Sequence, residues 1–334
     1  MLERLTRRVI AAPRIVLSLT VVLLALAGWY GLGAAEKMLP GGFEDPESES
    51  FHAAQVLDEQ FNQGGLQVVI KLDGPPGTDM STDPAAVAVG TQIAAELSQI
   101  DYVQQPVQSI WTAPELAGEL LSGDKDSALV IAGLAGGDEL APQRAEEIEE
   151  KFTGVRDGID VRVGGQALVF QQINDQTEKD LLTAELIAIP LSFLLLIVIF
   201  GGLVAAALPV AVGLVSIIGT LALLRAVTQF TDVSIFALNL TTALGLALAI
   251  DYTLLIVTRY REEVAGGRSR DEAIVRTVQT AGRTVVFSAV TVGLSLAALA
   301  ILPMYFLRSF AYAGLGVVTL AVVASVIITP ALLA

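Results

Sequence analysis

The 334 residues are 53% hydrophobic and carry a formal net charge of −15 at pH 7. Several apolar runs of about twenty residues, the length that crosses a hydrocarbon core, exclude an ordinary water-soluble protein. The chain has no cysteine, which excludes a disulfide framework and a thiolate metal site.

Six apolar runs predict a polytopic α-helical membrane protein. They cover residues 15–32, 186–200, 203–224, 235–257, 285–302 and 310–334. The first run is longer than the apolar core of a cleaved signal peptide, so we expect an uncleaved membrane anchor. The second and third runs are separated only by a short glycine-containing segment, which predicts a tight helical hairpin.

The distribution of charge predicts how these spans are oriented. Residues 36–180 contain 27 acidic and 8 basic side chains. Arginines gather instead before the first span and between the fourth and fifth spans: Arg4, Arg7, Arg8, Arg14, Arg259, Arg261, Arg268, Arg270, Arg276 and Arg283. Since basic residues favour the cytoplasmic side, we expect a multi-pass protein of the plasma (inner) membrane with both termini in the cytoplasm. Residues 36–182 are then extracytoplasmic.

The acidic segment between the first two spans has its own pattern of elements. The predicted order is helix, strand, helix, strand, strand, helix, strand, at residues 48–61, 66–72, 84–97, 102–111, 127–134, 142–152 and 159–163. From the first strand onward this is the ferredoxin-like order, so an α+β extracytoplasmic domain is expected. A polar helix over 167–182 then runs without a proline into the second span.

The expected organisation has five parts. They are the cytoplasmic N-terminus and first span (1–35), the outer domain and stalk (36–182), spans two to four (183–258), a cytoplasmic basic amphipathic loop (259–283) and spans five and six (284–334), the last expected to be incomplete. Within the loop, Ser269 and Glu272 have the spacing of a capping box. A short helix on the inner membrane surface is therefore predicted there.

Asp251 and Tyr252 lie in the otherwise apolar fourth span. A carboxylate near the centre of a spanning helix costs roughly 2.5 to 3.5 kcal/mol on insertion scales, so it generally faces a bundle interior, a partner or a proton path. Asp251 is therefore predicted to carry protons, with the Tyr252 hydroxyl orienting it or continuing a water chain. Simple packing of Tyr252 is the alternative.

Three hydroxyl residues of the fifth span, Ser288, Thr291 and Ser295, recur at intervals of three and four, which places them on one helix face. They are candidates for a polar path beside Asp251. Small hydroxyl residues are also common in helix packing within membranes, so that alternative stays open.

Other chemistries lack their residues in this sequence. There is no G-x-x-x-x-G-K-[ST] phosphate loop, which argues against ATP hydrolysis. His52 is the single histidine and lies in the outer segment, so no histidine metal site is expected near the membrane. We expect no enzyme, no metal, no cofactor and no nucleic-acid partner.

Residues 245–263, GLALAIDYTLLIVTRYREE, closely resemble the transporters called mycobacterial membrane protein large (MMPL), of the resistance-nodulation-division (RND) superfamily. Residues 282–292 extend the resemblance, and the arrangement of spans and outer loop extends it over the whole chain. The specific feature is an Asp-Tyr pair eight residues before an Arg-x-Arg-Glu-Glu boundary.

The resemblance implies the N-terminal half of a secondary exporter of lipids or other hydrophobic molecules, driven by the proton gradient. Asp251 would be the proton carrier, Tyr252 its partner and the outer domain a porter domain. Members of the family have two such halves, so the resemblance also implies a missing C-terminal half or a second chain. The chain would then be a fragment or the product of a split gene. A homo-oligomer, a non-transporting scaffold or sensor, and a proton-driven protein-secretion factor are alternatives.

Overall fold

The computed structural model describes residues 2–61 and 65–334. The chain divides into two compact units, which are described separately. The helical unit contains Met1–Phe43 and Leu181–Ala334, and the α/β unit contains Glu44–Asp180.

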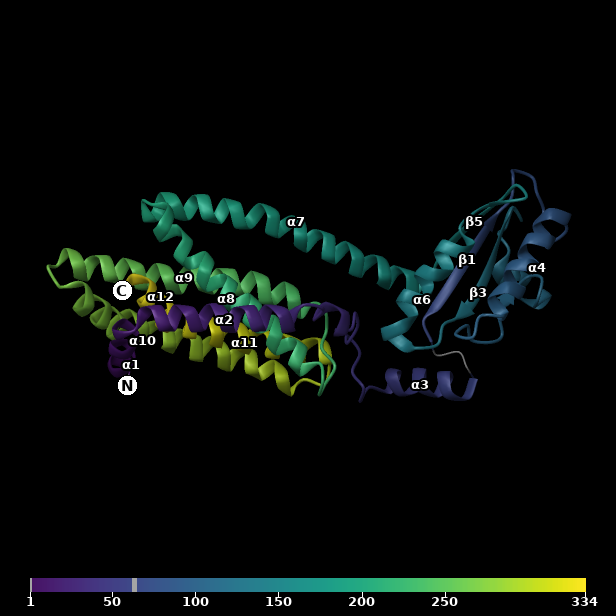
Figure 1. Cartoon of the computed structure of the whole chain (residues 1–334). Helices are drawn as coiled ribbons and strands as arrows, with labels where there is room; N and C mark the ends of the chain where they lie inside the picture. Colours follow the sequence, from purple (N-terminus) through teal and green to yellow (C-terminus); the bar gives the residue numbers. More distant parts are fainter. Residues whose placement is uncertain (1, 62–64) are drawn as a thin grey trace. The chain divides into compact units, whose positions relative to one another are not determined.

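The α/β unit is built on a five-stranded antiparallel sheet (Figure 1). Its strands are β1 (Gln67–Asp73), β2 (Gln108–Ser109), β3 (Ser127–Gly133), β4 (Gly154–Arg156) and β5 (Ile159–Gly164). They lie in the order β2-β3-β1-β5-β4, with Ile70 of β1 opposite Val130 of β3 and Val163 of β5. Helix α4 (Pro84–Ser98) connects β1 to β2, and α6 (Gly137–Phe152) connects β3 to β4.

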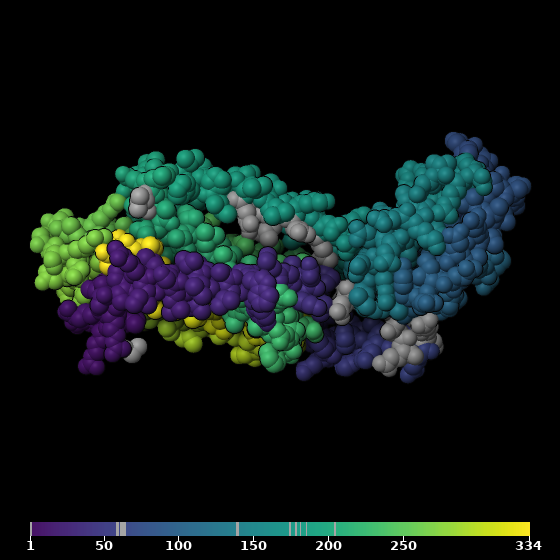
Figure 2. All heavy atoms as spheres, viewed as in Figure 1, coloured from purple at the N-terminus to yellow at the C-terminus, as the bar shows by residue number. Residues whose placement is uncertain are grey.

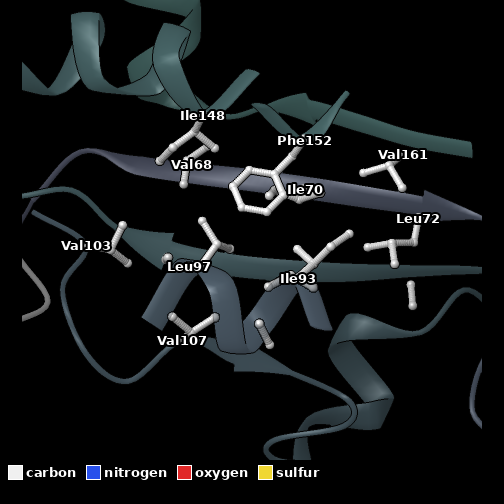
Figure 3. Packing of buried hydrophobic residues seen from close by; sticks show 14 of the residues in the cluster. Val68, Ile70, Leu72, Ile93, Leu97, Val103, Val107, Ile148, Phe152 and Val161 are labelled. Carbon is white, nitrogen blue, oxygen red and sulfur yellow. The ribbon is translucent and has the colours of Figure 1, made fainter. Parts of the chain in front are cut away.

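The core of this unit follows from strand alternation. Val68, Ile70 and Leu72 of β1 are fully buried, whereas the alternating Gln67 and Lys71 are exposed. The helices add further apolar side chains to the same cluster, as Figure 3 shows for Ile93, Leu97, Ile148 and Phe152. The sheet therefore buries one face beneath its helices.

One strand prediction in this unit was largely wrong. Of residues 102–111, only β2 joins the ladder, together with an isolated bridge between Val103 and Leu134. Pro106 has no N–H to donate to a strand neighbour. Beyond β2 the chain turns through hydrogen bonds between Ser109 and Thr112. The structure also contains a short helix α3 (Glu49–Phe61), close to its predicted position.

Six helices of the described residues are long and apolar enough to cross a membrane, as predicted. They are α2 (Pro13–Gly31), α7 (Gln166–Phe200), α8 (Leu203–Val227), α9 (Ala237–Ala265), α10 (Arg270–Ala297) and α11 (Tyr305–Val323) with its extension to Leu333. Gly201 and Gly202 form the predicted tight turn between α7 and α8, with Gly201 at φ +67°.

Helices α8, α9, α10 and α11 pack against one another in the helical unit (Figure 1). Helix α2 packs along α8, and its purple side chains run along the visible face of this unit (Figure 2). Helix α7 contacts this bundle near its end, where Leu196 and Phe200 pack with Ala206 and Val257.

The last span contains an irregular segment. After α11 the chain forms a π-helical segment at Ala324–Ile328 and then α12 (Thr329–Leu333). Such π segments widen the helix locally and are frequent at functional sites.

The prediction of a separate short helix within residues 259–283 was wrong. The capping box of Ser269 and Glu272 is present, but the helix that it begins, α10, continues without interruption through the fifth span. No proline lies between Arg270 and Ala297, so nothing stops the helix from propagating. Only residues 266–269 separate α9 from α10, and we call the end of the bundle that carries this turn the α9–α10 end.

A further helix was missed from sequence. Helix α1 (Leu2–Ala11) is strongly amphipathic. It contacts α10, where the Gln279 Nε2 atom donates to Glu3 Oε2 at 2.8 Å. Thr6 and Val9 are buried, and Arg4 and Arg8 are exposed.

Candidate functional site

Asp251 lies at the midpoint of α9, fourteen residues from each end of the helix. At 1.5 Å per residue, that is about 21 Å from either end of the helix. The side chain is exposed on the surface of this chain, whereas the next residue, Tyr252, is 5% exposed. Consecutive helical residues point about 100° apart, so the two side chains lie at the edge between the open and packed faces of α9.

Small residues make room for the Tyr252 ring. It belongs to a buried cluster with Ala281, Val285 and Ala289 of α10 and with Ala321 of the last span. The Tyr252 hydroxyl is buried without a hydrogen bond of normal geometry, and the Ser288 side chain comes within interaction range of it. The structure therefore brings Asp251, Tyr252 and Ser288 together.

Asp251 lines an open cleft of about 550 Å³. The cleft extends along α9 to Glu262, eleven residues nearer the α9–α10 end, which is about 16 Å. Its polar lining is completed by Thr258, Arg259, Thr280 and Thr284. The arrangement places a carboxylate at mid-helix, a second carboxylate near the helix end and hydroxyls between them.

Of the predicted polar residues of α10, Ser288 lies near Tyr252, but none of the three lines this cleft. Ser288, Thr291 and Ser295 are all exposed. The Thr291 hydroxyl donates to the Phe287 carbonyl oxygen at 3.1 Å, and the Ser295 hydroxyl donates to the Thr291 carbonyl oxygen at 3.0 Å. Neither Thr291 nor Ser295 lines the cleft that the described residues form around Asp251. Their role in a proton path stays a prediction.

Sequence reasoning missed Thr280, Thr284 and Glu262. The signal was present, because Thr280, Thr284 and Ser288 recur every four residues and so continue the same face of α10. Glu262 was noted only as part of the motif at the helix end. Four residues after Thr258, it lies on the same face of α9.

An ion-pair network centred on the buried Glu263 carboxylate lies at the end of the cleft. The Glu263 carboxylate is 2% exposed and pairs with Arg259 at 2.5 Å and with Arg268 from the α9–α10 turn. Arg259 also pairs with Glu262 at 2.9 Å. These contacts hold the Arg259 guanidinium and the Glu262 carboxylate beside the cleft.

The MMPL family model matches residues 42–334 of the chain. Trehalose monomycolate exporter MmpL3 of Mycolicibacterium smegmatis is 34% identical over 328 residues, covering 96% of this chain and 32% of that protein. MmpL3 of Mycobacterium tuberculosis is 32% identical over 329 residues, covering 96% of this chain and 34% of that protein. The mycolic acid-containing lipids exporter MmpL11 of M. smegmatis is 29% identical over 323 residues, covering 94% and 33%.

The chain thus spans about a third of the length of these curated relatives. Among solved structures, the X-ray structure of a heavy metal efflux pump has a TM-score of 0.51 and 17% identity, covering 84% of this chain and 36% of that one. At that identity the likeness concerns the fold alone.

Proposed function

Because the chain belongs to the MMPL family of the resistance-nodulation-division superfamily, we propose that it is the N-terminal half of a lipid exporter driven by protons passing through Asp251 and Tyr252. The observation that carries this proposal is the position of Asp251, a carboxylate at the midpoint of a spanning helix beside a buried tyrosine hydroxyl. Asp251 takes a proton from one side of the membrane and releases it to the other. The change between its charged and neutral forms favours different packings of the helices around it.

The lipid substrate is proposed from the relatives, since MmpL3 and MmpL11 are exporters of mycolate lipids. A multi-pass position in the plasma membrane follows from the same proposal. The α9–α10 end and the N-terminus are cytoplasmic, because α1 and the start of α10 carry the arginines that favour that side. The acidic α/β unit is then extracytoplasmic.

The α/β unit is proposed to be a ferredoxin-like porter domain. Without the short β4, its strands follow the chain order β1-α4-β2-β3-α6-β5 and lie side by side as β2-β3-β1-β5. That connection and order are those of a ferredoxin-like sheet. Substrate lipid passes through this unit after it leaves the membrane.

A second half, in the same polypeptide or in another chain, is proposed to cover Asp251. The Asp251 carboxylate is exposed, and the cleft beside it, lined by α9 and α10, is open. In lipid an ionised side chain at that depth is costly, so a polar protein surface is the expected neighbour.

The test is Asp251→Asn in the complete transporter, with Asp232→Asn as the matched control. Asp232 is an exposed carboxylate outside the described helices, between α8 and α9. Asp251→Asn is expected to abolish lipid export while the protein remains folded and in the membrane, and Asp232→Asn to leave export unchanged. Extracted envelope lipids and the amount of protein in membranes are measured together. Normal export by the Asp251→Asn variant would refute the proton role of Asp251. If export were lost only when the α/β unit is deleted, a scaffold would be favoured.

A further inference from the structure

Besides Ser234 and Tyr252, four hydroxyl side chains in the described part of the helical unit are buried without a hydrogen-bond partner. They are Thr253 of α9, Thr277 of α10, Ser325 of the π segment and Thr329 of α12. Each is at most 1% exposed. A buried hydroxyl without a partner loses its bonds to water and gains none in return, so all four require an explanation.

Three other buried hydroxyls of this unit each donate to the carbonyl oxygen four residues before them in their own helix. These are Ser216, Thr220 and Thr241, at 2.9, 2.7 and 2.8 Å. The same local acceptor is the normal partner for Ser and Thr within a helix. The four unpartnered hydroxyls therefore differ from equally buried neighbours, and burial alone does not account for them.

The first of the four faces the π segment. Thr253 lies one helical turn from Ala249, on the same face of α9. Ala249 packs in a buried cluster with Ala324 and Ile328 of the π segment. Thr253 thus lies on the face of α9 that meets the irregular part of the last span.

Thr277 and Ser325 lie on faces that meet around Tyr252. Thr277 is one turn from Ala281, and Ser325 is four residues beyond Ala321. Ala281 and Ala321 pack together in the cluster that contains Tyr252. Both hydroxyls therefore continue that cluster towards the α9–α10 end.

The hydroxyls occupy successive levels between that end and the proposed proton carrier. The Arg270 Nε atom donates to the Leu333 carbonyl oxygen at 2.6 Å, which sets the ends of α10 and α12 at one level. From that level, helix rise places Thr329 about 6 Å, Thr277 about 10 Å and Ser325 about 12 Å into the bundle.

Tyr252 and the adjacent Thr253 lie at the level of Ala281, which is eleven residues beyond Arg270 and so about 16 Å into the bundle. The axial steps from one hydroxyl level to the next are about 2 to 6 Å. Hydrogen bonds between oxygens are about 2.8 Å long, so one bridging water spans a separation of roughly 5 Å.

We propose that Thr253, Thr277, Ser325 and Thr329 bind a short file of internal waters beside the π segment, and that these waters carry protons between Asp251–Tyr252 and the α9–α10 end. Buried waters typically make about three hydrogen bonds to polar groups that otherwise lack partners, which is the environment that these hydroxyls provide. The π segment widens the last span where such waters need room. This inference rests on the proposed proton coupling and gives it a route contained entirely within this chain.

The test uses the complete transporter with two hydroxyls removed, as Ser325→Ala combined with Thr329→Val. The proton-coupled transport rate is expected to fall at least tenfold. The matched control is Thr220→Val, which removes a buried hydroxyl that already has its partner in the Ser216 carbonyl and is expected to change the rate less than twofold. A second variant, Ser325→Thr with Thr329→Ser, keeps both hydroxyls and is expected to retain transport.

Water itself is measured by radiolytic hydroxyl labelling of the wild-type protein. Ile256 and Ile328, which are at most 7% exposed, are expected to be labelled because bound water lies next to them, and the double variant is expected to lose that labelling. Wild-type transport by the double variant, or no labelling of these isoleucines in the wild type, would overturn the proposal. If Asp251→Asn abolishes export while the hydroxyl-free variant transports normally, this route fails and the proton role of Asp251 stands.

Discussion

Gly165, at the junction of β5 and α7, is the position where one added methyl group is expected to do most damage to the α/β unit. Its φ is +104°, a conformation that side chains other than glycine rarely adopt. A Cβ atom there would lie 2.7 Å from the Gln67 carbonyl oxygen and 2.8 Å from the Val69 nitrogen, both backbone atoms of the central strand β1. Backbone atoms within a five-stranded ladder cannot move aside as a flexible side chain does.

Two costs therefore add for Gly165→Ala. Holding a residue with a Cβ at this φ costs roughly 1 to 3 kcal/mol, and relieving the overlap costs roughly 1 to 3 kcal/mol. The expected loss is about 2 to 6 kcal/mol of unfolding free energy. Gly158→Ala is the matched control, because Gly158 has a φ of +83° and open space around its Cβ position. It is expected to lose only the conformational part, roughly 1 to 3 kcal/mol.

The assay is denaturant unfolding followed by the fluorescence of Trp111, which packs against Gly90 in the α/β unit. The chain has two tryptophans, so the measurement is made in a Trp29→Phe background. Trp29 is 76% exposed on α2, and its replacement does not touch the α/β core. Equal losses for Gly165→Ala and Gly158→Ala would refute the role assigned to the backbone overlap.

Two further predictions concern a carboxylate and a helix cap. Burial opposes ionisation of Asp73, but hydrogen bonds from Lys71 and Ser127 and the positive charges of Lys71 and Arg162 outweigh it and hold the pKa of Asp73 below 3.8. The folded state then binds fewer protons than the unfolded state in this range. The contribution of Asp73 to the unfolding free energy is therefore fully present above about pH 4 and is lost as pH drops through the lowered pKa. Asp73→Asn is expected to flatten that part of the profile, measured by the same unfolding assay between about pH 2 and 5; an unchanged slope would contradict the assignment. Ser269→Ala removes the capping bond that the Ser269 hydroxyl accepts from the Glu272 N–H and leaves the one that the backbone N–H of residue 269 donates to the Glu272 carboxylate. It is expected to cost about 1 kcal/mol, seen as faster amide hydrogen exchange in the first turn of α10 and not in α11.

The spans could be predicted from sequence because hydropathy over about twenty residues is a strong local signal. Helix α1 could not be found in that way, since three of its ten residues are arginines. It is held by contacts with α10, including Glu3 to Gln279, that join residues distant in sequence. The same local reasoning found the cap at Ser269 but not the continuation of the helix into the span. The composition changes from polar to apolar after Arg283, but this change does not interrupt the backbone hydrogen bonds of the helix.

The pair Asp251 and Tyr252 could be identified from sequence, but the direction of each side chain could not. Thr258 and Glu262 share a helix face with Asp251, but the sequence alone does not give the direction in which that face points. Packing supplies it, because small residues on α10 accept the Tyr252 ring and leave Asp251 on the open side. The unpartnered hydroxyls were equally hidden, since Thr253 and Thr241 look alike in sequence and differ only in whether the hydroxyl bonds to its own helix.

The proposed proton path has one part on the open side of α9, at Asp251, and another on its packed side, at Tyr252. On the open side, Asp251 and Glu262 share a cleft whose remaining wall this chain does not supply, and leaving a carboxylate there against lipid would cost roughly 2.5 to 3.5 kcal/mol. On the packed side, Tyr252 and the four hydroxyls are already enclosed by α9, α10 and the last span. Covering the cleft with a second half therefore changes the surroundings of Asp251 much more than those of Tyr252. Protonation of Asp251 is accordingly the step expected to respond to movement of the second half, while the hydroxyls on the packed side remain a fixed route to the α9–α10 end.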